Sequence, residues 1–232
     1  GTVSLPTLEQ DALFLAELRR RHPGARIVGK TLVRDHAVLK ALLERSAADL
    51  VIHGEADLTI VDIVYGRGTA GTAWLDAGSP DTAPSFNFDE GSPVEDLNQL
   101  PIPARDLLPN ERYRYPLLGT PVATLQTSRG CPYPCGYYCP YPLVEGVKWR
   151  SQTPERILAE LKDVVERQGI TKIYFRDATF TLNQERIARL CDLIVASGWR
   201  LEWVCETRVD CLGDTVLEKM REAGCVGLLV GV

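Results

Sequence analysis

The chain carries three cysteines on one short stretch, Ser128-Arg129-Gly130-Cys131-Pro132-Tyr133-Pro134-Cys135-Gly136-Tyr137-Tyr138-Cys139-Pro140-Tyr141-Pro142. Its prolines and its glycine predict an irregular loop rather than a helix or a central strand, because proline breaks helices and cannot donate to a strand ladder. Such a loop can turn its three sulfurs toward one inorganic centre. Three thiolates suit a [4Fe–4S] cluster and leave one iron open for a small-molecule ligand.

Two other interpretations of the loop stay open. Structural zinc is one, although it prefers four protein ligands. No fourth ligand is near the loop, since the histidines all lie far upstream: His22, His36 and His53. Three free thiols without a metal are the other. Disulfides are disfavoured, because the seven cysteines are an odd number and no signal-like segment opens the chain.

The remaining cysteines and the composition indicate the compartment and exclude some partners. Four cysteines lie in apolar helix or strand contexts and are expected to be reduced core residues: Cys191, Cys205, Cys211 and Cys225. This usage predicts a reducing cytoplasm. The formal net charge of the 232 residues is −5, and no Lys/Arg cluster indicates nucleic-acid binding. No apolar run is long enough to span a membrane.

The first part of the chain alternates strands and helices. The pattern predicts strands over 2–5, 26–32 and 49–53, and helices over 8–21 and 36–45. Such alternation favours a parallel sheet. Residues 61–110 are rich in Gly, Pro, Asp and Ser, and we expect a short hairpin near 72–76 followed by a linker.

The alternation resumes after residue 120. Strands are predicted over 122–127, 172–175, 201–205 and 226–232, and helices over 153–167, 183–196 and 214–222. This order suits a full or partial parallel barrel. The last strand reads as one buried on both faces, yet no helix follows it, and the chain also opens directly on a strand. We therefore expect the chain to be a fragment of a longer protein.

These segments resemble a known family. Residues 127–232 resemble the first half of a radical S-adenosylmethionine (SAM) core. The matching pieces are the cysteine loop, Phe175-Arg176-Asp177-Ala178-Thr179-Phe180, Cys205-Glu206-Thr207-Arg208-Val209-Asp210 and Ala223-Gly224-Cys225. Residues 1–60 and the linker around 100–108 resemble the second half of the cobalamin-binding domain that often precedes such cores.

The resemblance implies an α/β fold class with two folded parts. A partial Rossmann-like domain of the cobalamin-binding type is expected over residues 1–60. A linker with a short hairpin follows over 61–120. The N-terminal half of a radical SAM partial (β/α) barrel is expected over 121–232.

The resemblance also implies the cofactors. Cys131, Cys135 and Cys139 would ligate a [4Fe–4S] cluster, and SAM would chelate its open iron through amino and carboxylate groups. The family's usual spacing is Cys-x3-Cys-x2-Cys, whereas Tyr138 stands at the usual third position here. We expect the added residue to bulge so that Cys139 becomes the third ligand.

Further residues are implied around SAM. Tyr137 and Tyr138 would lie beside the adenine, or pack under the loop. Asp177, Glu206 and Arg208 follow strand ends, where parallel barrels gather catalytic groups. Arg208 would make a forked contact with the SAM carboxylate, or a salt bridge with Glu206 or Asp210. Asp177 would contact the cofactor, or cap the helix that follows Leu182. The sequence assigns no catalytic residue.

A corrinoid is implied in the first part of the chain. Ser4, Thr7 and Gly29 are expected at the carboxyl edge of its sheet, where open α/β sheets bind ligands. Small residues there would admit the nucleotide tail of cobalamin. Lys30 stands where a second glycine would leave more room. The small residues favour cobalamin binding, and Lys30 counts against it.

Three functions follow. The first is a cobalamin-dependent radical SAM methyltransferase that acts at an unactivated carbon of an unknown small molecule or natural product. A reductant such as flavodoxin or ferredoxin would supply its electrons. The second is a radical SAM methylthiotransferase or cyclase without bound cobalamin. The third is a non-enzymatic zinc-binding module that organises a partner surface.

Overall fold

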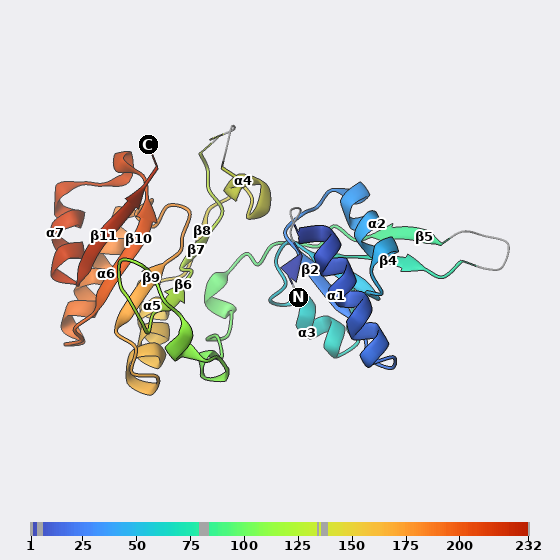
Figure 1. The fold of residues 1–232 in the computed structure, drawn as a ribbon. Helices are drawn as coiled ribbons and strands as arrows, with labels where there is room; N and C mark the ends of the chain where they lie inside the picture. Colours follow the sequence, from blue (N-terminus) through green and yellow to red (C-terminus); the bar gives the residue numbers. More distant parts are fainter. Residues whose placement is uncertain (1, 4–6, 79–83, 134, 136–138, 232) are drawn as a thin grey trace. The chain divides into compact units, whose positions relative to one another are not determined.

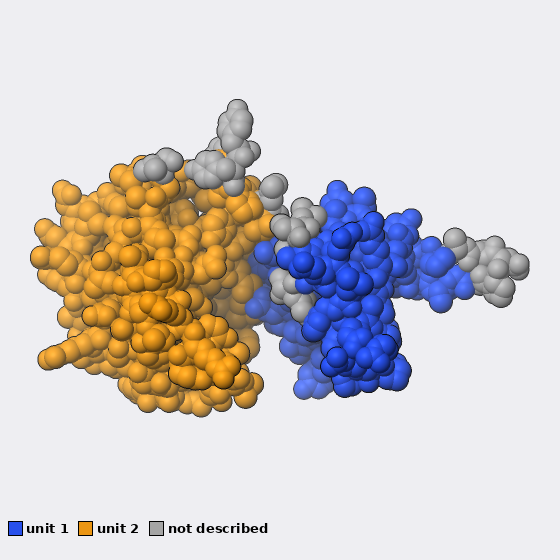
Figure 2. Space-filling model, in the orientation of Figure 1, with its two compact units in different colours: residues 1–95 blue, residues 96–232 orange. Residues whose placement is uncertain are grey.

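A computed structural model describes the chain except for residues 1, 4–6, 79–83, 134, 136–138 and 232. The chain forms two compact units, residues 1–95 and 96–232 (Figure 2). The division falls after Glu95 and not at the expected boundaries of 60 and 120. The physical reason is that the predicted hairpin pairs into the first sheet, while the later linker packs on the second unit.

Unit 1 is a five-stranded sheet with helices (Figure 1). Its elements are β1 (Thr2–Val3), α1 (Leu8–Arg21), β2 (Val28–Thr31), α2 (His36–Arg45), β3 (Leu50–His53), α3 (Thr59–Val64), β4 (Thr72–Asp76) and β5 (Ser85–Phe88). The strands follow in chain order, with β1 to β3 parallel and β4 and β5 antiparallel. The predicted parallel order and hairpin are confirmed. The sequence missed α3, a short helix with one buried residue, Ile63.

The core of unit 1 lies between its sheet and helices α1 and α2. Leu15 of α1 and Leu39 and Leu42 of α2 are buried with Val51 of β3. The Asp35 side chain accepts a hydrogen bond from the Val38 N–H and so begins α2. The regularly spaced apolar side chains of both helices face the sheet, as the sequence predicts.

Unit 2 begins with three 3-10 turns, Leu97–Gln99, Arg105–Leu107 and Asn110–Arg112. It continues with β6 (Ala123–Leu125), β7 (Ser128–Arg129), α4 (Tyr141–Val144), β8 (Arg150–Ser151), α5 (Pro154–Lys162), a π-helical turn (Asp163–Arg167), β9 (Lys172–Phe175), α6 (Gln184–Ala196), β10 (Glu202–Thr207), a 3-10 turn (Val209–Cys211), α7 (Asp214–Glu222) and β11 (Cys225–Val230). The Thr153 hydroxyl caps α5 as predicted, accepting from the Arg156 N–H.

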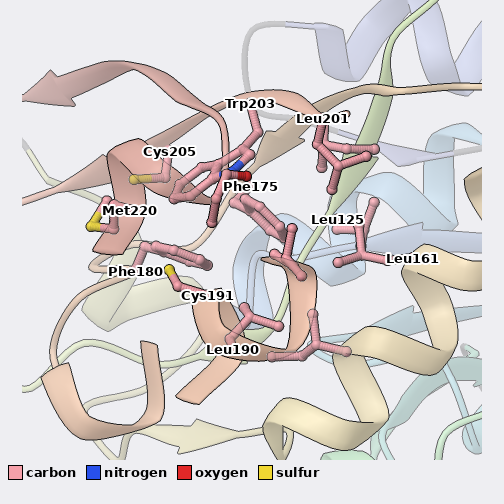
Figure 3. Packing of buried hydrophobic residues seen from close by; sticks show 14 of the residues in the cluster. Leu125, Leu161, Phe175, Phe180, Leu190, Cys191, Leu201, Trp203, Cys205 and Met220 are labelled. Carbon is pink, nitrogen blue, oxygen red and sulfur yellow. The ribbon is translucent and has the colours of Figure 1, made fainter. Parts of the chain in front are cut away.

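The main sheet of unit 2 is parallel, with strand order β6-β9-β10-β11 (Figure 1). Helices α5, α6 and α7 cover one face and bury a core with that face. Figure 3 shows Phe175, Phe180 and Trp203 at its centre. The rings of Phe175 and Phe180 stack with centroids 4.7 Å apart, and Trp203 meets Phe175 edge-on at 5.3 Å. This rigid layer positions the carboxyl ends of the strands.

Two details of unit 2 concern its last strand and the cysteine loop. Val226 and Val230 of β11 are 58% and 39% exposed, and β11 is an edge strand with β10 as its one neighbour within the described residues. This apolar strand is thus left partly uncovered, with no described helix after it, as the sequence indicates. The cysteine loop also ends in helix α4, which begins at Tyr141, because the loop's last proline occupies a first-turn position. A helix with the length and apolarity needed to cross a bilayer is absent from the described residues.

Candidate active site

A cleft of about 440 Å³ lies at the carboxyl ends of β9, β10 and β11. Parallel sheets place their ligands at this edge. The cleft is lined by Cys131, Cys135, Cys139, Tyr141, Ala178, Thr179, Glu206, Thr207, Arg208, Leu229, Val230 and Gly231. The structure thus brings together the three cysteines, Glu206 and Arg208 of the predicted site.

The three loop cysteines are free thiols. Cys131 is buried, with its sulfur 3.9 Å from the Thr179 hydroxyl, and Cys135 and Cys139 are half-buried. Among the described residues, no three Cys, His, Asp or Glu side chains lie close enough together to hold one metal ion. The loop nevertheless lines one cleft with three thiols, which are the donor set of an iron–sulfur cluster. The chemistry of this donor set fits such a cluster, although the sulfurs are not gathered into a coordination sphere.

The start of the loop is held by close backbone contacts. Gly130 has a φ of +84°, and a Cβ there would lie 2.2 Å from the Lys148 carbonyl oxygen, so only glycine fits. The Gly130 N–H donates to Glu145 Oε2 at 3.1 Å, and the Cys131 N–H donates to the Gly146 carbonyl at 3.0 Å. Burial raises the pKa of Glu145. The chain just before the first thiol is thus fixed in position.

Asp177 is buried and is not among the residues that line the cleft. Its Oδ1 accepts from the Thr127 and Ser128 N–H groups at 2.6 and 3.1 Å, and its Oδ2 accepts from the Thr127 hydroxyl. Arg186 of α6 donates to the Thr127 carbonyl at 2.9 Å and to its hydroxyl at 2.6 Å. Burial raises the pKa of Asp177, and the charge of Arg186 opposes that rise. Asp177 thus ties the end of β9 to the chain that enters the cysteine loop.

Glu206 lines the cleft at the end of β10 and accepts hydrogen bonds from two tyrosines. The hydroxyl of Tyr174 donates to Oε1, and that of Tyr141 donates to Oε2 at 3.3 Å. Arg176 Nε lies 3.9 Å from Oε1. Burial and the bond to Glu206 raise the pKa of Tyr174, so its hydroxyl remains a donor. The site thus holds an anionic group on its β10 side.

Arg208 supplies a cation on the same wall. Its Nε and Nη2 make a fork with Asp210 at 2.9 and 2.7 Å, which raises the pKa of Arg208. Its guanidinium carbon lies 3.9 Å from the centroid of the Tyr133 ring, and Nη1 lies 3.7 Å from Cys135 Sγ. The salt bridge with Asp210 is therefore formed, and the same side chain still borders the cleft.

The other predicted ligands lie elsewhere. Tyr137, Tyr138 and Ser4 fall outside the described residues. The Thr7 hydroxyl donates to Asp11 Oδ2 at 2.5 Å at the start of α1. Gly29 is the second residue of β2 and not its last, so its expected place at the strand end is wrong. The reason is that β2 extends to Thr31, where its ladder with β3 also ends.

Sequence reasoning missed several residues around the cleft. Thr127 had a signal, because a hydroxyl residue stands at the end of a strand directly before the loop. Tyr174 and Arg186 had none, since one lies within a strand and the other on an ordinary amphipathic helix.

Comparisons with known proteins agree with this geometry. The family model described as the radical SAM superfamily matches residues 125–232, which include the cysteine loop and all four strand ends. An uncharacterized methyltransferase of Pyrococcus horikoshii is 31% identical over 191 residues, 79% of this chain and 40% of that protein. The hopanoid C-2 methylase of Rhodopseudomonas palustris is 33% identical over 59% of this chain and 25% of that protein.

Two further comparisons extend over most of the chain. An anaerobic magnesium-protoporphyrin IX monomethyl ester cyclase of Cereibacter sphaeroides is 25% identical over 83% of this chain and 32% of that protein. The solved structure of the cobalamin-dependent SAM radical enzyme OxsB superposes with a TM-score of 0.77 at 18% identity, covering 100% of this chain and 35% of that one. The fold class is thus confirmed. The chain spans at most 40% of the length of these curated relatives.

Proposed function

Because residues 125–232 belong to the radical SAM superfamily, we propose that the protein reductively cleaves SAM and transfers methyl groups with the help of cobalamin. One observation carries the proposal: three free thiols, an anionic Glu206 and a cationic Arg208 line a single cleft within the matched segment. This combination suits an iron–sulfur cluster together with a zwitterionic ligand.

Cys131, Cys135 and Cys139 would hold a [4Fe–4S] cluster. When bound, this cluster supplies one electron and an open iron at which SAM is positioned for cleavage of its carbon–sulfur bond. The chain's part is to keep three thiols on one wall. Gly130 and the buried Asp177 serve that part, because they fix the backbone that leads into the loop.

Glu206 and Arg208 would orient SAM. A carboxylate and a guanidinium on one cleft wall match the ammonium and the carboxylate of an amino acid. Asp210 holds the Arg208 guanidinium by a fork, so little side-chain freedom remains to be lost on binding. We also propose that Tyr137 and Tyr138 lie beside the adenine or pack under the loop.

Cobalamin is assigned to unit 1. The support is the parallel arrangement of β1, β2 and β3 with their helices, together with two relatives named methyltransferase or methylase and the cobalamin-dependent enzyme OxsB of similar fold. Ser4 and Thr7 keep their predicted place near the corrinoid, since both precede α1. Gly29 would act through packing and not through contact, because it lies beneath α1.

A second reaction is favoured by a specific observation, since a cyclase relative aligns with 83% of the chain. A radical SAM cyclase without bound cobalamin would use the same cleft and leave the strand ends of unit 1 without a corrinoid.

We also propose that flavodoxin or ferredoxin supplies the electrons and that the substrate is a small molecule or natural product. The protein would act in the cytoplasm, where its seven free cysteines stay reduced.

Anaerobic reconstitution tests the proposal. The purified protein, supplied with iron, sulfide and hydroxocobalamin, should bind about four irons per chain, as a [4Fe–4S] cluster requires. It should form 5′-deoxyadenosine from SAM with dithionite, and it should retain a corrinoid through gel filtration. A colourless protein that binds one zinc and no iron would contradict the enzyme. Iron without a retained corrinoid would favour the cyclase.

A further inference from the structure

A second cavity of unit 2, of about 300 Å³, lies beside the edge strand β6. It is lined by Arg105, Leu108, Asn110, Tyr113, Arg114, Tyr115, Val122, Ala123, Thr124 and Tyr174. Its size is at the lower end of small-molecule sites. Two cations and three phenol rings line it, and no carboxylate does. The lining therefore favours a small anion with a flat apolar body.

The charge beneath the cavity is unbalanced. Arg105 Nη2 lies 2.5 Å from Glu160 Oε1, and Arg156 Nη1 lies 3.5 Å from Glu160 Oε2. The side chains of Arg105, Arg156 and Glu160 are 10%, 14% and 5% exposed, so two guanidinium groups share one carboxylate away from water. Arg105 Nη1 lacks a hydrogen-bond partner among the described residues, and Arg156 Nη1 has the 3.5 Å ion-pair contact but no hydrogen bond. A buried excess of positive charge is stabilised by a nearby anion.

The rim adds a second cation and the aromatic surface. Arg114 is exposed, and none of the ion pairs recorded for the described residues includes it. Tyr113 is 45% exposed. The rings of Tyr115 and Tyr174 lie 4.4 Å apart at a tilt of 32°. If the anionic group of an aromatic ligand paired with Arg114, the ligand's ring would pack on the phenol rings of these tyrosines.

One hydrogen bond connects the cavity to the wall of the cysteine cleft. Tyr174 lines the cavity, and its hydroxyl donates to Glu206, which lines the cleft. We propose that this cavity is a binding site for a small aromatic carboxylate, held by Arg114 above the Arg105–Glu160–Arg156 group. The site is separate from the cleft, and the inference does not depend on the cluster or on the proposed reaction.

Fluorescence titration with 2-naphthoate tests the site, with uncharged 2-naphthol as the matched probe. The exposed Arg114→Gln should raise the dissociation constant for 2-naphthoate about tenfold, the loss expected for one charge-assisted contact. The same change should leave 2-naphthol binding as it was. Arg112→Gln is the control, because Arg112 is exposed two residues away, pairs with Glu111 and does not line the cavity.

Three results would overturn the inference. One is the absence of saturable 2-naphthoate binding by the parent protein. Another is equal weakening by Arg112→Gln and Arg114→Gln, which would indicate general charge attraction. The third is binding of 2-naphthol as tightly as 2-naphthoate, which would indicate an apolar pocket without anion recognition. None of these results bears on cluster loading, so the proposed function is tested independently.

Discussion

Asp177 accepts hydrogen bonds from both the backbone N–H and the hydroxyl of Thr127, which lies 50 residues earlier in the chain. This buried contact joins the end of β9 to the end of β6, immediately before the cysteine loop. Its consequence is that the first thiol is positioned by a residue that does not line the cleft itself.

Asp177→Asn should weaken this anchor, because an amide keeps the size of the carboxylate but loses its charge and places an NH₂ where donors converge. We expect a loss of about 1–3 kcal/mol in the free energy of unfolding, with poorer iron retention. Urea unfolding and iron analysis measure both. The exposed Asp192→Asn, which breaks a surface pair with Lys219, is the control and should change neither. Full stability with unchanged iron in Asp177→Asn would contradict the anchoring role.

Replacing any one of Cys131, Cys135 or Cys139 by Ala should abolish iron loading and SAM cleavage together, because a cluster held by three thiolates does not survive the loss of one. Iron and sulfide analysis after anaerobic reconstitution measures this. Cys225→Ala, outside the loop, should load normally. A full cluster in Cys139→Ala with loss in Tyr138→Ala would show that the loop spacing has been interpreted wrongly.

Arg208→Gln should raise the dissociation constant for SAM about tenfold, since one charge-assisted contact to the SAM carboxylate is lost. Iron content should stay unchanged. Equilibrium dialysis of the reconstituted protein measures the first quantity. Arg189→Gln is the matched control, because Arg189 is exposed and pairs with Glu155 on the helical face. If Arg208→Gln also lost its iron, the role of Arg208 would be to support the cysteine loop through Cys135 and not to bind SAM.

Gly29→Leu should destabilise unit 1 by about 1–3 kcal/mol through overpacking. A Cβ at Gly29 would lie 3.3 Å from Val51 Cγ2 and 3.8 Å from Leu15 Cδ1, so a larger side chain displaces α1 from the sheet. Hydrogen exchange over residues 8–45 measures the loss. Gly68→Leu is the control, because a Cβ there meets nothing within 4 Å. Unchanged exchange in Gly29→Leu would contradict this packing.

The stability of unit 1 should depend on His53. Burial lowers the pKa of His53, whose Nε2 lies 2.8 Å from the Asp89 carbonyl and whose ring stacks on Phe88 at 4.3 Å. Because the folded pKa lies below the unfolded value of about 6.5, stability is full above that pH. It falls below that pH, where the unfolded chain binds the proton first.

Hydrogen exchange of β3 and β4 between pH 7 and 5, corrected for the intrinsic rate, measures this dependence. His53→Gln keeps a donor for Asp89 but does not titrate, so its opening free energy should stay level over the same range. An equal fall in both proteins would assign the acid sensitivity to other groups.

The sequence by itself determined the local elements. The predicted bounds of α1, α2 and α7 agree with the structure to the residue, because apolar spacing and terminal signals act within one or two turns. The rule that parallel strands present their carboxyl ends at one edge also placed Cys131, Glu206 and Arg208 together. These inferences needed only neighbours along the chain and one topological rule.

Only the tertiary structure decided what each strand-end residue contacts. Asp177 turned inward to Thr127, Glu206 acquired the hydroxyls of Tyr174 and Tyr141, and Gly29 lay under α1. The first two depend on contacts between residues 32 to 65 positions apart, and on which of two strand faces is buried. A one-residue shift reverses that face, and strand pairing and helix packing fix it collectively. No local pattern encodes that choice. The contacts that set the chemistry of the cleft could therefore be identified only from the assembled sheet.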